Sequence, residues 1–123
     1  KIQFAPLVDF LELQKLIAQV DINIVPLVQN TFTNCKSELK FFEAAAVNTV
    51  TVATPIYTYK NAIEHGKTGF LCEQGQWYGC IKDLYNKKSD LSALIQNARE
   101  YCIHKYSGES FLKQIEDAYE SFL

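Results

Sequence analysis

Two short runs of β-branched and apolar residues constrain the fold of this chain most strongly. The first run is Ile22–Leu27, and the second is Thr49–Thr54, which stops at Pro55. Such runs are typical of strands buried on both faces, because they lack the alternation of polar and apolar residues seen in half-exposed strands. Between them, Ser37–Val47 is rich in strong helix formers and includes an alanine triplet. The pattern therefore predicts a strand–helix–strand unit with parallel strands.

The rest of the chain extends this alternation of strands and helices. Apolar residues recur at helical spacing over Phe10–Val20, and the polar stretch Gln29–Asn34 is typical of a loop. The other expected elements are strands at Ile2–Ala5 and Gly69–Cys72 and helices at 60–64, 76–86, 90–105 and 109–122. Ser89 and Ser107 are placed to cap the last two helices. We therefore predict one α/β domain with a Rossmann-like parallel sheet, helices on both of its faces, and further C-terminal helices.

Charge and composition narrow the classes of function. The formal net charge is -2, which excludes a general nucleic-acid binder, because such a protein needs a basic face. Within residues 1–123, no apolar run approaches the roughly 20 residues that cross a membrane, and no stretch has the pattern of a signal peptide; the longer parent stays open for both. The four cysteines include no pair at zinc-ligand spacing, so we expect reduced thiols in a cytoplasmic protein and no metal site. The chain starts at Lys1 without Met, and we interpret residues 1–123 as one incomplete domain of a longer protein.

The segment 34–46 places basic, acidic and small apolar residues on one predicted helix. With about 100° between successive residues, an apolar stripe forms and Glu43 falls at its edge. That stripe consists of Leu39, Phe42 and Ala46. Lys36 and Lys40 fall on the same side of the helix as Glu43. A carboxylate near the core needs a partner, because an unpaired buried charge is costly.

Two interpretations of this segment remain open from the residues alone. In the first, Glu43 pairs with Lys40, which stabilises the helix by only ~0.2–0.5 kcal/mol, and Lys36 is merely solvated. In the second, the helix begins at the carboxyl edge of the sheet, where ligands bind in open α/β sheets. Its free N–H groups then form an anion site, and Glu43 accepts hydrogen bonds from sugar hydroxyls.

Three stretches of the chain match, in order and spacing, the motifs of one family. They are the strand 21–27 with its Pro-Leu end, the run Lys36-Ser37-x-Leu39-Lys40-x-x-Glu43-Ala44-Ala45-Ala46 with the strand Val50–Thr54, and the turn His65-Gly66-x-Thr68-Gly69. Together they resemble the donor-binding signature of retaining glycosyltransferases of the GT-B type, the glycosyl transferases group 1 family. The resemblance covers nearly the whole chain and implies a C-terminal, nucleotide-sugar-binding domain. The acceptor domain and the start of this domain would then lie outside the chain.

The resemblance implies a role for each matching position. Glu43 matches a glutamate that hydrogen-bonds the ribose hydroxyls of the donor. Lys36 adds charge beside the diphosphate, which the family holds with backbone N–H groups at the start of the helix. The donor-binding positions are Lys36, Ser37, Glu38, Leu39, Lys40 and Glu43. Cys35 stands where the family has another glutamate, so the usual contact to the transferred sugar is missing.

Other positions receive smaller roles. Tyr57 and Tyr59 follow a strand end and are, with Cys35, candidates to contact the donor or the acceptor. Asn48 replaces a glycine of the family, and asparagine tolerates the left-handed backbone of that turn. Trp77 is expected to be a core anchor. His65, which precedes Gly66, is expected to serve the end of a helix.

The implied function is transfer of a hexose from a nucleotide-diphospho-sugar to an acceptor in polysaccharide, lipopolysaccharide or glycoconjugate synthesis. Fixed positive groups would stabilise the leaving diphosphate, so no metal or other cofactor is expected. The acceptor contacts and any catalytic base would come mainly from the missing domain, which would leave this chain inactive alone. The parent is expected to be cytoplasmic and peripheral at a membrane. The last helix carries an apolar stripe that would drive dimers if exposed: Phe111, Ile115, Ala118 and Phe122.

Two alternatives stay open. The first is a degenerate, non-catalytic relative of the transferases, and Cys35 is the feature that favours it. The second is a doubly wound signalling or binding domain, which would need acidic residues at its strand ends for metal and phosphoryl chemistry. The predicted strand ends carry Pro26, Leu27, Thr54 and Pro55 instead.

Overall fold

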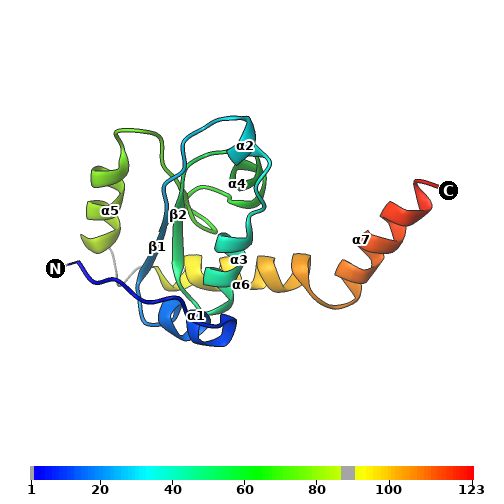
Figure 1. Ribbon diagram of the computed structural model, residues 1–123, viewed down its shortest axis with the longest axis horizontal. Coiled ribbons are helices and arrows are strands. Elements are labelled where there is room, and N and C mark those ends of the chain that lie inside the picture. The colour runs from blue at the N-terminus through cyan, green and yellow to red at the C-terminus, as the bar shows by residue number, and fades with distance from the viewer. Residues whose placement is uncertain (1, 87–90) are drawn as a thin grey trace.

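The computed structural model describes residues 2–86 and 91–123 of the chain (Figure 1). Its strands are β1 (Ile22–Val25), β2 (Val50–Ala53) and β3 (Phe70–Leu71). Its helices are α1 (Phe10–Ile17), α2 (Thr31–Asn34), α3 (Leu39–Ala46), α4 (Tyr57–Ala62), α5 (Trp77–Asn86), α6 (Ser92–Tyr106) and α7 (Gly108–Glu120). This order confirms the predicted α/β class.

The strands form one parallel sheet in the order β1-β2-β3. The register places Ile22 opposite Val50 and Val52 opposite Phe70. Parallel neighbours need a crossover over one face of the sheet, and α3 and α4 lie in the two crossovers. Because the strands run the same way, their carboxyl ends meet at one edge, where the loops after β1, β2 and β3 gather.

Helices cover both faces of the central strand β2, as predicted. All four residues of β2 are buried. Val50 and Val52 belong to one core cluster with Leu84 of α5. Ala53 belongs to the other cluster, with Phe41 of α3. Successive side chains therefore enter opposite faces and are buried on both, which explains the run of β-branched and small residues in the sequence.

The apolar run Ile2–Ala5 forms no strand, so that prediction is wrong. Residues 2–9 have no regular structure, and Ile2 and Phe4 are 83% and 93% exposed. A strand forms only where a neighbour completes its ladder of hydrogen bonds. The composition of a short apolar run does not supply that neighbour.

Two helices start at positions where no helix start was predicted, and one predicted helix cap is not among the described residues. The predicted loop Gln29–Asn34 contains the short helix α2, whose first turn is closed by Asn30 Oδ1 accepting from Thr33 N at 2.9 Å. Helix α4 begins at Tyr57 and not at residue 60. Ser89, the expected cap of the helix before the last, lies outside the described residues.

Helix α7 projects away from the rest of the molecule at its C-terminal end (Figure 1). Ser107 is its N-cap residue, as predicted, but its hydroxyl donates to Ile103 O at 2.6 Å and does not cap α7. No residue of α7 is buried. Within the described ranges, no helix combines the length and the apolar character needed to cross a membrane.

Candidate functional site

The start of α3 presents a row of backbone N–H groups without acceptors. The bond from Lys36 N to Thr33 O, at 3.1 Å, closes the end of α2. The next backbone donor with an acceptor is Phe41, whose N–H reaches Glu38 O at 2.8 Å. Within the described part of the chain, the N–H groups between them have no acceptor: Ser37, Glu38, Leu39 and Lys40. Unpaired N–H groups and the positive end of the helix dipole attract an anion to such a position.

Helix α3 buries a different stripe from the one predicted. Phe41, Ala44 and Ala45 are buried, whereas Leu39 is 44% exposed and Ala46 is also exposed. The segment offers two apolar stripes, and the buried one carries the adjacent alanines. Small side chains allow close packing of α3 against the sheet and α6, so this stripe fits between them better.

Glu43 lies on the side of α3 that faces away from the buried stripe, because about 100° separates successive helical residues. Its side chain is half-buried. Among the described residues it has no hydrogen-bond or ion-pair partner, so the predicted alternative of a pair with Lys40 is wrong. Lys36 and Lys40 are both exposed. The carboxylate is therefore free to accept hydrogen bonds from a ligand that lies over this side of the helix.

The side chain of Glu38 is tied to α6. Tyr106 Oη donates to Glu38 Oε1 at 2.6 Å. Burial and this bond raise the pKa of Tyr106 above its ordinary value. Burial, with a smaller contribution from the charges of Glu38 and Glu43, also raises the pKa of Tyr59 to about 12. Glu38 can therefore offer a ligand its backbone N–H, while its carboxylate anchors the start of α3.

The remaining candidate residues differ in accessibility. Lys36 is exposed, and its Nζ lies 4.6 Å from the centroid of the Phe32 ring. Cys35 is an exposed free thiol. Tyr57 is 67% exposed at the start of α4, whereas Tyr59 is 1% exposed and belongs to the core. The structure thus leaves Tyr57 open to a ligand and encloses Tyr59.

A hydrogen-bond network that sequence reasoning missed joins the loops after β1 and β2. Leu27 N donates to Thr54 Oγ1 at 2.8 Å, and Thr54 N donates to Val25 O at 3.1 Å. Further along, Asn34 Oδ1 accepts from Tyr57 N at 2.9 Å. These bonds place the starts of α3 and α4 at the same edge of the sheet. No local pattern could have revealed them, because the partners are far apart in the sequence.

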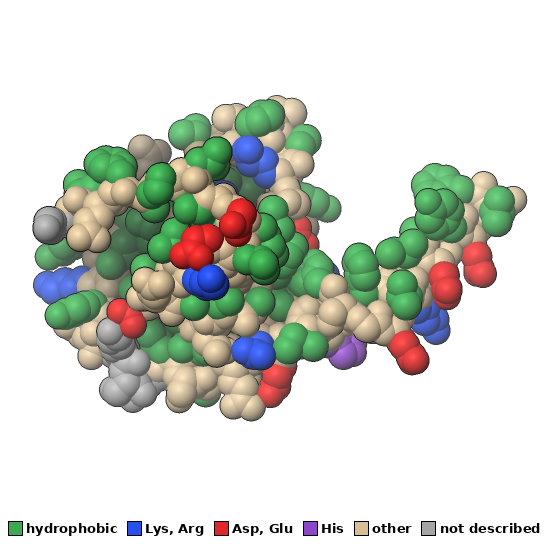
Figure 2. Space-filling model, turned by 60° about the horizontal axis from the view of Figure 1, so that its bottom comes forward, with side chains coloured by type: hydrophobic (Ala, Val, Ile, Leu, Met, Phe, Trp, Pro, Cys, Tyr) green, Lys and Arg blue, Asp and Glu red, His purple; other side chains and the backbone are tan. Residues whose placement is uncertain are grey.

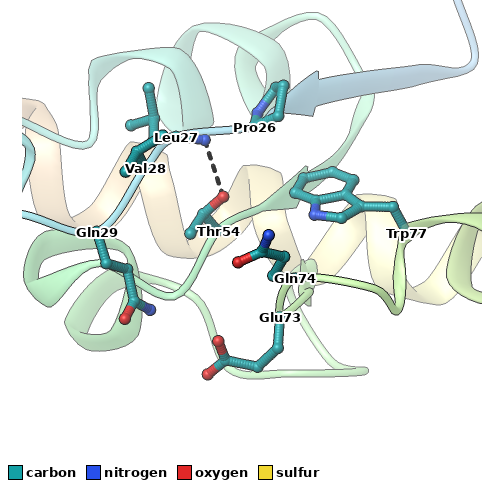
Figure 3. Close-up of a pocket in the computed structure, with 8 residues that line it drawn as sticks. All are labelled: Pro26, Leu27, Val28, Gln29, Thr54, Glu73, Gln74 and Trp77. Carbon is teal, nitrogen blue, oxygen red and sulfur yellow. Dashed lines mark hydrogen bonds between the residues drawn. The ribbon is translucent and has the colours of Figure 1, made fainter.

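A cleft of about 470 Å³ opens at this carboxyl edge (Figure 3). The loops after all three strands line it, together with the start of α5. Its residues are Pro26, Leu27, Val28, Gln29, Thr54, Glu73, Gln74 and Trp77. Trp77, predicted to be a core anchor, is half-buried at the start of α5: it packs against the core cluster that contains Val52 and Leu84, and it also lines the cleft. Ligands of open α/β sheets bind at this edge.

Two smaller predictions are confirmed. Asn48 has a φ of 64°, in the left-handed region that the turn after α3 was expected to need. The structural role predicted for His65 is also confirmed, but not its place at a helix end: its Nδ1 accepts from Leu71 N of β3 at 3.0 Å, and its ring packs edge-on against Phe70 with centroids 5.5 Å apart. Within the described residues, no three His, Cys, Asp or Glu side chains gather where they could hold a metal ion.

The chain is similar to known proteins in sequence and in fold. The family model described as "Glycosyl transferases group 1" matches residues 1–87. No curated protein matches the chain. Among solved structures, the chain is similar to Alr3699/HepE of Anabaena in complex with UDP, with a TM-score of 0.67 and 18% sequence identity. The match covers 87% of this chain and 29% of HepE, so the chain spans under a third of that protein, and at this identity the likeness shows the fold alone.

Proposed function

Because the chain belongs to the glycosyl transferases group 1 family, we propose that it binds a nucleotide-diphospho-sugar donor whose sugar is transferred to an acceptor. In this proposal the chain is the C-terminal, donor-binding part of a retaining enzyme of the GT-B type. The UDP bound to HepE supports a nucleotide at this fold, although it is a property of that protein. Family membership also leaves the alternative of a signalling domain without support.

The observation that carries the proposal is the row of unpaired N–H groups from Ser37 to Lys40 at the start of α3. A diphosphate placed there would accept several backbone hydrogen bonds and would lie at the positive end of the helix dipole. The exposed ammonium groups of Lys36 and Lys40 add positive charge nearby. These groups are fixed before the reaction, so they would stabilise the charge that develops on the leaving diphosphate without a metal ion.

Glu43 supplies the second part of the proposed donor site. It lies just over one turn beyond the helix start and is half-buried, with no partner among the described residues. A carboxylate accepts hydrogen bonds from vicinal hydroxyls, such as those of ribose, with two oxygens at once. We therefore propose that the Glu43 carboxylate accepts hydrogen bonds from the ribose hydroxyls. Tyr57, which is exposed at the same edge, would contact the donor or the acceptor.

The remainder of the reaction is assigned to parts of the protein beyond this chain. The acceptor site and any catalytic base would lie mainly in an acceptor domain, so the chain alone would bind donor weakly and transfer nothing. The parent would be a hexosyltransferase of polysaccharide, lipopolysaccharide or glycoconjugate synthesis. Its cytoplasmic location and peripheral contact with a membrane stay predictions.

One observation favours a second candidate, a relative that has lost catalysis. Cys35 stands where the resemblance calls for a glutamate that contacts the transferred sugar, and it is an exposed thiol. A thiol is a weak hydrogen-bonding group and cannot replace a carboxylate as an acceptor of hydrogen bonds from sugar hydroxyls. This candidate keeps the fold but predicts no binding of any nucleotide sugar, either by this chain or by the full-length parent.

Calorimetry with the diphosphates of uridine, guanosine and thymidine, and with their sugars, tests the proposal. We expect weak binding of one nucleotide class, and Glu43→Ala should weaken it by about 1–3 kcal/mol, because ribose hydroxyls lose their acceptor. Glu116→Ala, an exposed glutamate on α7, is the matched control and should bind like the wild type. Wild-type affinity in Glu43→Ala would remove Glu43 from the site. If calorimetry detects no nucleotide binding, either to this chain or to the full-length parent, the result would favour the degenerate relative.

A further inference from the structure

The cleft in Figure 3 has a different chemistry from the helix start assigned to the donor diphosphate. Its lining includes one carboxylate, that of Glu73, and neither lysine nor arginine. A phosphate would meet a negative charge there and no cation. The helix start, in contrast, has unpaired N–H groups and two exposed lysines. The charges therefore separate the two sites and disfavour an anionic ligand in the cleft.

Hydrogen-bonding groups with spare capacity converge on this cleft. Within the described residues, the carboxylate of Glu73 and the side-chain amide of Gln74 have no hydrogen-bond partner. Gln29 donates its Nε2 to Pro55 O at 3.3 Å, which fixes the amide and leaves its Oε1 free. These groups together offer both donors and acceptors. A ligand with several hydroxyl groups could satisfy them, since each hydroxyl both donates and accepts.

Hydrogen bonds hold the backbone of the turn that carries Glu73 and Gln74, whose side chains are exposed. Glu73 N donates to Gln76 Oε1 at 3.1 Å, and Gln76 N donates to Glu73 O at 3.1 Å. Gly75, inside this turn, has a φ of 87°, which favours glycine. The turn thus presents Glu73 and Gln74 at the rim of the cleft, ahead of Trp77. A few polar groups at the rim of this kind provide orientation in a small-molecule site.

The ring of Trp77 gives the cleft its apolar wall. Figure 3 shows the indole directed from the start of α5 toward the other lining residues, with the Gln74 amide next to it and Thr54 beyond that amide. A flat aromatic face suits the apolar C–H face of a pyranose ring, whose hydroxyls then point outward to the amides and the carboxylate. The volume of about 470 Å³ lies within the range of about 300–1,000 Å³ that small-molecule sites have.

From these features we propose that the cleft is a subsite for a neutral sugar ring, which stacks on Trp77 and hydrogen-bonds to Glu73, Gln74 and Gln29. The inference rests on the proposed function, because it places a saccharide at the same edge of the sheet as the donor. The ring has two sources, the acceptor saccharide or the sugar carried by the donor. Both have the same chemistry at this site, and the test separates them.

Trp77 is the single tryptophan of the sequence, so tryptophan fluorescence reports on the cleft directly. We expect the methyl glycosides of glucose, galactose or N-acetylglucosamine to change this emission saturably, and UDP alone to leave it unchanged. Glucuronate should bind at least about fivefold more weakly than glucose, because Glu73 repels its carboxylate, and Glu73→Gln should narrow that difference. Gln74→Ala should weaken binding of the preferred glycoside about fivefold or more, as expected for a lost hydrogen bond.

Controls keep the test specific. Gln96→Ala makes the same change at an exposed position of α6 outside the cleft and should bind like the wild type. Trp77→Phe removes the reporter, so ligand-detected NMR measures its affinity, which should fall while circular dichroism stays unchanged. If a nucleotide sugar displaces the methyl glycoside, the ring comes from the donor, and if both bind together, it comes from the acceptor. Either result supports the subsite.

The outcome that overturns the subsite is also distinct from failure of the donor site. Emission that stays constant with every glycoside and nucleotide sugar up to millimolar concentrations, while calorimetry still detects a nucleotide diphosphate, rejects the cleft alone. An unchanged glycoside affinity in both Gln74→Ala and Glu73→Gln rejects it as well. Glycoside binding without any nucleotide binding would instead reject the proposed donor site.

Discussion

Asn48 combines a left-handed backbone with a long-range anchor. Its φ of 64° lies in the left-handed region, where non-glycine residues other than asparagine and aspartate are costly. Arg99 Nη1, on α6, donates to Asn48 Oδ1 at 3.3 Å and to Ala46 O at 3.2 Å. Arg99 thereby satisfies a carbonyl at the end of α3, which would otherwise depend on water. The residue therefore serves both the turn into β2 and the packing of α6.

The left-handed backbone gives a stability prediction at this position. Asn48→Ala should lower the free energy of unfolding by about 1–2 kcal/mol, because alanine is strained at this φ and the bond to Arg99 is lost. Asn48→Gly is the matched control, since glycine adopts the same φ without strain, and its loss should be smaller. Urea unfolding followed by circular dichroism measures both. Equal stabilities of the two variants would contradict the role of backbone strain.

Helix α4 shows how one element receives its start from another. Its N-cap residue, Ile56, has no side chain that can cap, and Asn34, the last residue of α2, accepts the Tyr57 N–H at 2.9 Å. Sequence reasoning placed this helix at residue 60, because local signals for an N-terminus are absent before it. The cap from a distant element explains why the helix begins three residues earlier.

Asn34→Ala should therefore destabilise the domain by about 1 kcal/mol, the usual effect of removing a helix cap. Asn61→Ala is the matched control, because Asn61 is exposed within α4 and makes no hydrogen bond among the described residues. Thermal and urea unfolding should distinguish the two variants. Loss of stability in Asn61→Ala alone would show that α4 does not depend on the distant cap.

At the scale of the whole molecule, α7 carries its apolar side chains on one side and its charged side chains on another. Figure 2 shows hydrophobic side chains along one side of the projecting arm and acidic ones along another. Ile115 and Phe122 on the apolar side are 39% and 89% exposed. Glu116 and Glu120 lie among the charged residues. An exposed apolar face of this kind favours association, and the charges would remain in water when two copies pair through it.

We accordingly expect the chain to self-associate through α7 at micromolar concentrations, and sedimentation velocity measures this. The double variant Ile115→Glu and Phe122→Glu should be monomeric, because charges on the apolar face would be buried without partners. Lys113→Glu, on the charged side, is the control and should leave the association intact. A wild-type chain that stays monomeric at all concentrations would contradict the expectation.

The sequence by itself determined the α/β class, the two main strands and the segment that forms α3. The run Thr49–Thr54 was informative because full burial of a strand requires residues that tolerate burial on both of its faces. For β1 the predicted burial on both faces is wrong: it ends the strand order, only Val25 is buried, and Ile24 is 52% exposed. The sequence also indicated the left-handed turn at Asn48, since this depends on the residue at that position. Each of these properties follows from periodicity or from local backbone energies.

Only the tertiary structure decided which stripe of α3 is buried, whether Ile2–Ala5 finds a strand partner, and where α4 starts. It also brought Gln29, Gln74 and Trp77 to one cleft from the loop after β1, the turn after β3 and the start of α5. These outcomes depend on which surfaces meet across the fold. The free energy of such contacts belongs to pairs of residues far apart along the chain, so no local pattern specifies them.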